Sequence, residues 1–305
     1  MTADTSATEV VRSEPARRAR WPVAVLRTAR PRQWPKNLLV FAAPLAGASL
    51  GRHDGLLYAL AAAVAFGFAS AAVYFVNDVV DAERDRLHPR KRYRPVASGA
   101  LPRQHAVVLG AASALAGLAV GVLISEPLLT ACVGAYLTLS FLYSWVLKHI
   151  PGVEVAFVAI GFVLRALGGA VATHVPPSGW FLTVCSLGAL MVAIGKRYTE
   201  LSVLGDAAAG HRPVMRWYSL PALRAAQRLV SSGMLAAYLF WALAETDRWM
   251  QGWHLASVLP LAVALVRFDR LTGLAEDKPV EDLISRDPVM LCCEVTWLTL
   301  FLVGL

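Results

Sequence analysis

The sequence predicts an all-α integral membrane protein of nine transmembrane helices, with a cytoplasmic N-terminus and an external C-terminus. The first observation is composition: 57% of the 305 residues are hydrophobic and 16% are charged. In soluble domains, about 45–50% of the residues are hydrophobic and about 25% are charged. The second observation is that the apolar residues form runs, several of them of the roughly 17–25 residues that cross a bilayer as a helix. Lipid is therefore the expected solvent of most of the chain.

The candidate spans follow one another with short loops between them. Four are uncharged stretches: Leu56–Val76, Ala106–Ser125, Pro127–Leu147 and Gly179–Gly195. Val155–Thr173 is a fifth, although it contains Arg165. The shorter candidates are Asn37–Leu50, Leu229–Ala244, Gly252–Val266 and Pro288–Leu305.

The basic residues predict the orientation of these spans. With the N-terminus inside, 26 of the 29 lysines and arginines fall in the tail and the inner loops. The outer loops hold only Arg52 and Arg248. Because cytoplasmic loops accumulate Lys and Arg, this pattern indicates a multi-pass protein of the plasma membrane with its charged face in the cytoplasm. The net charge of +8 then belongs to short loops and indicates no nucleic-acid partner.

Two regions are expected from this organisation. Residues 1–36 are expected to form a basic cytoplasmic tail, and residues 37–305 are expected to form a single transmembrane catalytic domain.

The most informative stretch follows the span that ends near Tyr74. If the helix continues, the side chains of Asn77, Asp78, Asp81 and Asp85 share a stripe about 100° wide. Oxygen ligands at this spacing suit Mg²⁺ shared with substrate phosphates, and close carboxylates repel one another unless a cation compensates them. The alternative is a solvated acidic helix end that binds nothing.

Basic residues crowd the loop after this stripe. Cations beside a metal site form a cradle for phosphate groups, although some of them also serve membrane orientation. The candidates are Arg86, Lys91, Arg92 and Arg94.

Other inner segments carry further candidate phosphate contacts. The span that begins at Gly179 is followed by Lys196, Arg197, Tyr198 and Glu200. A helix-end salt bridge explains Lys196 and Glu200 equally well. Lys36 and Lys148 lie at the ends of other spans, where lysines also serve as interfacial anchors.

Arg165 lies inside a predicted span. An ionised side chain there costs at least about 2.5–3.5 kcal/mol and needs an anionic partner. Two partners remain open: a structural acid such as Glu294, or the phosphate headgroup of a bound lipid.

These residues resemble the UbiA superfamily of intramembrane prenyltransferases. The resemblance covers nearly the whole chain and rests on the N-D-x-x-D-x-x-x-D pattern at 77–85, after the second span. It implies nine helices around a central cavity, with two aspartate-rich loops that hold a Mg²⁺–diphosphate. This chain departs from that pattern in its second loop, which has Lys196, Arg197 and Glu200 where several aspartates are expected.

Three stretches look like a narrower branch, the actinobacterial phosphoribosyltransferases. They are RPRQWPKN at 30–37, DRLHPRKRYRP at 85–95 and GKRYTEL at 195–201. The departure in the second loop fits this branch, in which the diphosphate belongs to 5-phosphoribosyl 1-diphosphate (PRPP). The resemblance implies transfer of 5-phosphoribose from PRPP to decaprenyl phosphate, with release of diphosphate, for arabinan and arabinogalactan synthesis in the cell wall.

The resemblance also suggests roles for the candidate residues. Asp78, Asp81 and Asp85, with Asn77, would hold Mg²⁺ and the diphosphate. The loop cations would contact the phosphoribosyl donor, together with Tyr74, Lys196, Arg197, Tyr198 and Glu200. Lys36, Lys148 and Arg165 would serve the acceptor phosphate and the cavity wall. The acceptor phosphate is already anionic, so the reaction requires no general base.

Two rival functions come from different classes. The first is an ordinary superfamily member that moves a prenyl group from a prenyl diphosphate to an aromatic acceptor. The lack of several aspartates in the second loop is evidence against this function. The second is a transporter, although the charges gather at one membrane face and not along a path.

Small residues leave the oligomeric state open. Gly110, Ala114, Gly117 and Gly121 permit close helix packing. The neighbour could be another helix of the same chain or a second copy, so a homo-oligomer such as a trimer is compatible with the sequence.

Overall fold

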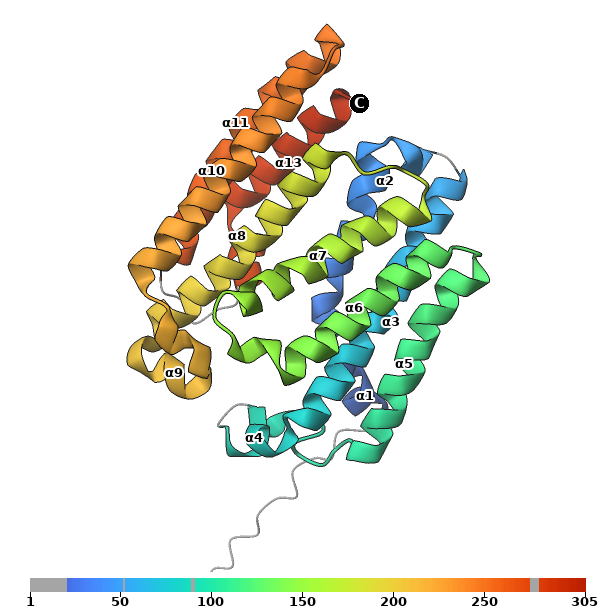
Figure 1. Cartoon of the computed structure of the whole chain (residues 1–305), viewed down its shortest axis with the longest axis vertical. Coiled ribbons are helices and arrows are strands. Elements are labelled where there is room, and N and C mark those ends of the chain that lie inside the picture. Colours follow the sequence, from blue (N-terminus) through green and yellow to red (C-terminus); the bar gives the residue numbers. More distant parts are fainter. Residues whose placement is uncertain (1–20, 52, 89–90, 275–279) are drawn as a thin grey trace, which may run out of the picture.

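The computed structural model describes residues 21–51, 53–88, 91–274 and 280–305 (Figure 1). Within these ranges every regular element is a helix, and no strand occurs. The predicted all-α class is therefore confirmed. The first 20 residues of the predicted N-terminal tail lie outside the described residues.

The first half of the chain forms a group of packed long helices. The long helices are α3 (His53–Val80), α5 (Arg103–Leu123), α6 (Pro127–Trp145) and α7 (Val153–Ala172). Helix α3 packs against α5, α6 and α7, and its buried alanines with Phe66 and Tyr136 of α6 form the largest described core cluster. Between α3 and α5 lie the short α4 (Ala82–Leu87) and the 3₁₀ turn η3 (Lys91–Tyr93).

The second half continues the bundle. Helix α8 (Gly179–Leu204) packs on α7 and on α10 (Leu220–Ala244), and α11 (Arg248–Thr272) packs on α10 and α13 (Pro288–Val303). The short elements η5 (Gly205–Ala207), α9 (Ala208–His211) and η6 (Pro213–Trp217) connect α8 to α10, and α12 (Val280–Arg286) precedes α13. In Figure 1, α4 and α9 lie at the same end of the bundle, and the C-terminus lies toward the other end.

Five described helices are long and apolar enough to cross a membrane, namely α5, α6, α7, α8 and the part of α3 from Asp54 to Val80. Helix α13 is apolar but has only 16 residues. Helices α10 and α11 have 25 residues each, about 37 Å of helix, but they carry charged side chains in the turns that adjoin the loops. The predicted total of nine spans therefore stays a prediction.

The segment predicted as the first span, Asn37–Leu50, is not one regular α-helix. It comprises the end of the 3₁₀ helix η1 (Pro31–Phe41), the short α2 (Ala42–Ala46) and the start of the turn η2 (Ser49–Gly51). Proline has no backbone N–H for the helical hydrogen bond, and Pro35 and Pro44 interrupt the region. The segment packs closely on α7, because a Cβ at Gly169 would lie 1.7 Å from the carbonyl oxygen of Val40.

The small residues of α5 are used inside the chain. A Cβ at Gly117 would lie 2.9 Å from the carbonyl oxygen of Ala65 on α3, and one at Gly110 would lie 3.3 Å from Phe75. These glycines thus allow α5 to approach α3, so they do not indicate a second copy of the chain.

Candidate active site

The acidic stripe lies at the junction of α3 and α4. The amide of Asp81 donates to the carbonyl of Asn77 at 2.9 Å, and the amide of Asp85 donates to the carbonyl of Asp81 at 2.8 Å. These bonds carry the helical repeat across the junction, which keeps the acidic side chains at one-turn spacing. Asp78 and Asp85 are buried and Asp81 is half-buried.

Arginines compensate the two buried carboxylates. Arg94 Nη1 donates to Asp85 Oδ2 at 2.7 Å and lies 3.6 Å from Asp78 Oδ1. Arg30 donates from Nη2 to the same Asp78 oxygen. Arg94, which the loop sequence predicts as a site residue, contacts both carboxylates. The structure thus brings Asp78, Asp85 and Arg94 together.

Arg30 is a site residue that the sequence reasoning did not single out. Its guanidinium also stacks on the ring of Tyr74, 4.9 Å from the centroid. Its backbone adopts φ +51°, a left-handed conformation unusual for a residue other than glycine. Its place before Pro31 disfavours the right-handed α region and so marks a helix boundary, but it does not predict the left-handed conformation. The bend there, between α1 (Trp21–Ala29) and η1, positions the side chain.

The end of α6 completes this part of the site. Lys148, in the 3₁₀ turn η4 (Leu147–His149), places Nζ 3.5 Å from Asp81 Oδ1. Ser144 donates to Asn77 Oδ1 at 2.6 Å. Asn77 therefore holds the helix junction against α6, and Lys148 lies beside the acidic stripe.

The acidic residues do not form a closed metal cage. Across the described ranges, no group of three or more His, Cys, Asp or Glu side chains is close enough to hold a metal ion by itself. A Mg²⁺ shared with phosphates needs only one or two protein carboxylates, since water and phosphate oxygens supply the rest. Asp78 and Asp85, both beside Arg94, fit that smaller requirement.

The other predicted loop cations lie apart from the carboxylates. Arg86 donates from Nε to the carbonyl of Ala97 at 3.1 Å, so it braces the loop. Arg92 contacts its neighbour Tyr93 through a 2.7 Å hydrogen bond and the ring face. Arg86, Lys91 and Arg92 are exposed, and within the part of the chain that the structure describes they do not contact the acidic stripe.

A second charged group lies where α7, α8 and η6 meet. Arg197 donates from Nε to Glu154 Oε1 and from Nη1 to Glu200 Oε2, each at 2.7 Å. Arg212 lies 3.7 Å from Glu154 and 3.5 Å from Glu200. Two of these residues, Arg197 and Glu200, are predicted site residues, whereas Arg212 and the central role of Glu154 are not predicted.

Tyrosines connect this group to its surroundings. Tyr218 accepts from the amide of Gly152 at 2.8 Å and donates to Glu154 at 3.3 Å. Burial raises the pKa of Tyr218, so the phenol keeps the proton that it donates. Arg212 donates to the hydroxyl of Tyr143 on α6 at 3.3 Å. The end of α6 and the turn η4 thus contact both charged groups, through Tyr143 on one side and Lys148 on the other.

The two remaining predicted site residues on α8, Lys196 and Tyr198, contact different neighbouring helices. Lys196 lies 5.7 Å above the ring of Phe162 on α7, on the side of the second charged group. The ring of Tyr198 stacks on Arg224 of α10, which is the opposite side. Tyr198 therefore supports the α8–α10 contact.

Arg165 is surrounded by neutral partners. It donates to Asn37 Oδ1 at 2.8 Å, to Ser70 Oγ at 2.9 Å and to Tyr136 OH at 3.0 Å. It also donates to the carbonyl of Gly161 at 2.6 Å. No carboxylate pairs with it in the part of the chain that the structure describes, and Glu294 is exposed on α13. Arg165 therefore joins η1, α3, α6 and α7 while its charge stays uncompensated by an acid.

Lys36 lies in η1, next to Asn37, and is half-buried. Its neighbour Asn37 is held by Arg165, so the position of this stretch depends on the same polar cluster.

Comparisons with known proteins agree with this architecture. The sequence profile described as the UbiA prenyltransferase family matches residues 37–282. The chain belongs to this family. The matched range thus contains the acidic stripe, the second charged group and all of the predicted site residues except Lys36, whereas Lys36 and Arg30 precede it.

Relatives of this UbiA chain carry a more specific name. It is 36% identical, over 90% of its length and 91% of the relative, to the decaprenyl-phosphate phosphoribosyltransferase of Mycobacterium tuberculosis. It is 33% identical, over 90% of its length and 84% of the relative, to the protein of that name from Corynebacterium glutamicum.

Solved structures confirm the UbiA fold. A UbiA homologue from Archaeoglobus fulgidus bound to DMAPP and Mg²⁺ superposes with a TM-score of 0.70. The match covers 91% of this chain and 99% of that one, at 17% sequence identity.

Proposed function

We propose that this protein transfers 5-phosphoribose from PRPP to decaprenyl phosphate and releases diphosphate. The observation that carries the proposal is the pair of buried carboxylates, Asp78 and Asp85, that share Arg94 at one end of a UbiA bundle. Relatives at 33–36% identity over 90% of the chain are named for this activity. The product would be a precursor for arabinan and arabinogalactan of the cell wall.

The second charged group supports a phosphoribosyl donor over a prenyl diphosphate. Both of its acids, Glu154 and Glu200, are engaged by Arg197, so they are poorly placed to bind a second metal. Lys196 adds another cation on the same helix. A group that presents net positive charge suits the additional phosphates of PRPP and the acceptor better than it suits a second metal ion.

The acidic stripe would hold Mg²⁺ together with the diphosphate of PRPP. Asp78 and Asp85 would be its main ligands, with Asp81 and Asn77 beside them. When bound, the ion would neutralise the charge that develops on the leaving diphosphate. Among the structural neighbours, the A. fulgidus homologue was solved with Mg²⁺, which supports a metal-dependent reaction.

The protein residues would position and neutralise the reactants. An oxygen of the lipid phosphate attacks the anomeric carbon of ribose while the bond from that carbon to the diphosphate oxygen breaks. The attacking group is already ionised, so no side chain has to remove a proton, and orientation and charge stabilisation provide the catalysis. Arg30 and Arg94 would exchange their carboxylate contacts for donor phosphates. Lys36 and Lys148 would attract the acceptor phosphate.

The topology belongs to the same proposal. Nine spans, with the N-terminus in the cytoplasm and the C-terminus outside, would place both charged groups at the cytoplasmic face of the plasma membrane. Soluble PRPP would then reach the site from the cytoplasm, and the decaprenyl chain would leave sideways between helices.

One assay tests the function. Purified protein in detergent or nanodiscs receives labelled PRPP, decaprenyl phosphate and Mg²⁺, and the products are a labelled phosphoribosyl lipid and free diphosphate. Failure to form this lipid, combined with consumption of a prenyl diphosphate and an aromatic acid, would replace the proposal with ordinary prenyl transfer. Failure with both substrate pairs would leave a non-catalytic role such as transport.

A further inference from the structure

A third charged region lies on the opposite side of α8 from the second charged group. It is a pocket of about 440 Å³ between the N-terminal part of α10 and the C-terminal end of α11. Its charged lining consists of Arg224, Arg228, Arg267, Asp269 and Arg270. We call it the arginine pocket. None of the residues proposed for phosphoribosyl transfer lines it.

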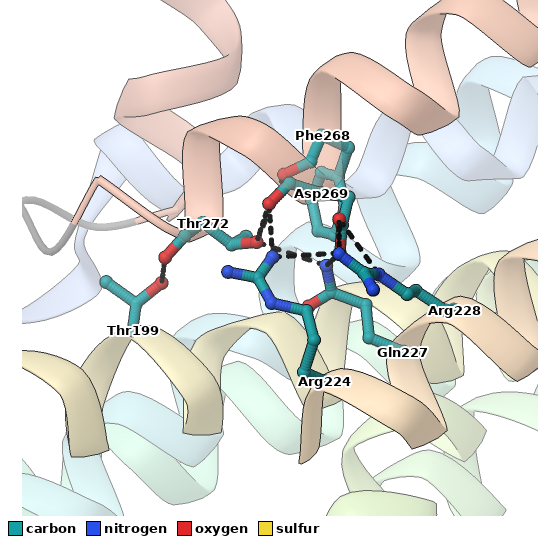
Figure 2. A network of polar contacts seen from close by, with 7 residues as sticks. All are labelled: Thr199, Arg224, Gln227, Arg228, Phe268, Asp269 and Thr272. Atoms are coloured by element: carbon teal, nitrogen blue, oxygen red, sulfur yellow. Dashed lines mark hydrogen bonds and ion pairs between the residues drawn. The ribbon is translucent and has the colours of Figure 1, made fainter. Parts of the chain in front are cut away.

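A polar network fixes the floor of the arginine pocket. Figure 2 shows Arg224, Gln227 and Arg228 of α10 converging on Asp269 of α11. The carboxylate of Asp269 accepts from Arg224 at 2.8 Å, from Gln227 at 3.1 Å and from Arg228 at 3.2 Å. One acid thus holds two guanidinium groups in place, which reduces the entropy that a ligand would otherwise lose on ordering them.

Arg224 is further constrained on two sides. Its guanidinium lies 4.1 Å from the centre of the Tyr198 ring. On the other side, a Cβ at Gly273 would come within 2.5 Å of Arg224 Nη2. A larger residue at position 273 would displace this guanidinium, so the observed position of Arg224 depends on an aromatic ring and on a residue without a side chain.

The charge of the pocket is not balanced by its described lining. Four arginines face the single carboxylate of Asp269. Arg267 is paired outside the lining with Asp287, at 2.6 Å. Arg270 is exposed and makes no side-chain contact with the described residues, and Arg228 is 67% exposed. The rim therefore presents Arg228 and Arg270 to an anion.

An apolar stripe on α11 leads to this rim. Leu259, Val263 and Val266 are exposed by 71%, 43% and 56%. With Arg270 they occupy positions i, i+4, i+7 and i+11, which share one helix face. An exposed apolar stripe that ends at an arginine matches a lipid whose acyl chains lie along the helix and whose headgroup lies at the interface.

We propose that the arginine pocket binds a phosphate group, presented by an anionic phospholipid of the leaflet that faces the active site. The chemistry that recognises it is a phosphate oxygen contacted by the guanidinium groups of Arg228 and Arg270, a geometry that arginine favours. Free phosphate is the other source of the same chemistry, and the experiment distinguishes the two.

The test uses Arg270→Gln, because this exposed side chain supports no described contact and its loss leaves the fold intact. Arg228→Gln/Arg270→Gln is the stronger variant. Arg248→Gln is the matched control, since Arg248 is an exposed arginine at the opposite end of the same helix. Each protein is placed in nanodiscs of phosphatidylcholine that contain a minor fraction of phosphatidylglycerol as the anionic probe. Native mass spectrometry reports the lipids that each protein retains.

Wild type and Arg248→Gln should retain phosphatidylglycerol, whereas Arg270→Gln should lose most of it and the double variant all of it. In pure phosphatidylcholine, inorganic phosphate should bind weakly and only to wild type and the control. Strong phosphate binding without lipid retention would assign the pocket to a soluble phosphate and overturn the lipid source. Equal retention by all four proteins would overturn the site itself, because the arginines would then serve orientation in the membrane alone.

Discussion

Arg197 and Glu154 form an ion pair of 2.7 Å in which the Glu154 side chain is fully buried and the Arg197 side chain is 9% exposed. The pair joins α8 to the first turn of α7. Only one Glu154 oxygen accepts a hydrogen bond, and Oε2 has none. Arg212 Nη1 lies 3.7 Å from this oxygen. A buried acid with a spare oxygen is costly. Under the proposed function, Glu154 would hold the Arg197 guanidinium in place for a donor phosphate.

The first prediction concerns this pair. Glu154→Leu should lower the free energy of unfolding by about 3–5 kcal/mol, because it leaves a buried guanidinium without its principal partner. Adding Arg197→Met should restore much of the stability, since an apolar pair of similar volume is tolerated at such sites. Thermal unfolding in detergent measures both changes. Activity should stay absent in the restored double variant, and its return would contradict a role for Arg197 in binding phosphate.

The second prediction concerns the acidic stripe. Asp81→Asn should reduce turnover on the order of 10²–10³-fold, the usual cost of removing one group that stabilises transition-state charge. It should leave unfolding unchanged, because Asp81 is half-buried and its partner Lys148 lies near the surface. The matched control is Glu83→Gln on α4, an exposed acid paired with Arg103. Wild-type turnover in Asp81→Asn, measured with saturating Mg²⁺ and PRPP, would remove Asp81 from the site.

Composition and residue spacing predicted much of this architecture because both depend on interactions within one segment of the chain. The apolar runs identified α3, α5, α6, α7 and α8, since burial in lipid demands uninterrupted hydrophobic length. The one-turn spacing of Asp78, Asp81 and Asp85 survived in the structure because the helical hydrogen bonds continue through the α3–α4 junction.

Contacts between distant segments were beyond the reach of that reasoning. Arg30 approaches Asp78 because the backbone turns at a left-handed residue, which periodicity does not reveal. Glu154 and Arg197 are 43 positions apart, and nothing local marks them as partners. Arg165 offered a choice between an acid and a lipid phosphate, whereas the structure gives it Asn37, Ser70 and Tyr136.

The third prediction concerns this arginine. Arg165→Ala should destabilise the protein by about 3 kcal/mol or more, since several buried acceptors lose their donor at about 1–3 kcal/mol each. Arg165→Lys should recover part of the stability but not the forked contacts to Ser70 and Tyr136. If Arg165 also serves the acceptor, KM for decaprenyl phosphate should rise in the lysine variant while KM for PRPP stays constant. An unchanged KM for both substrates would limit Arg165 to a structural role.

The fourth prediction concerns metal removal. Chelation of divalent ions should abolish formation of the phosphoribosyl lipid, and added Mg²⁺ should restore it, because the leaving diphosphate then lacks a counter-ion. Chelation should not change the unfolding temperature appreciably, since Arg30 and Arg94 already compensate the buried carboxylates of Asp78 and Asp85. Parallel activity and thermal-unfolding measurements in EDTA separate these effects. Full activity in EDTA would refute the proposed metal site.

The fifth prediction uses the ion pair between α11 and α13. Hydrogen bonds from Arg267, and one from the amide of Met290 at the start of α13, hold the pKa of Asp287 below its ordinary value. A depressed carboxylate pKa stabilises the fold above the unfolded value, about 3.9, and this contribution is lost as the pH falls through the folded pKa. Asp287→Asn keeps a side chain that caps a helix but removes the charge. Its unfolding temperature should therefore lie below that of wild type at pH 6, with the difference disappearing at the acid end of the titration. No difference from wild type at any pH in this range would show that the capping bond, which the asparagine variant keeps, and not the ion pair with Arg267, is the contribution that Asp287 makes.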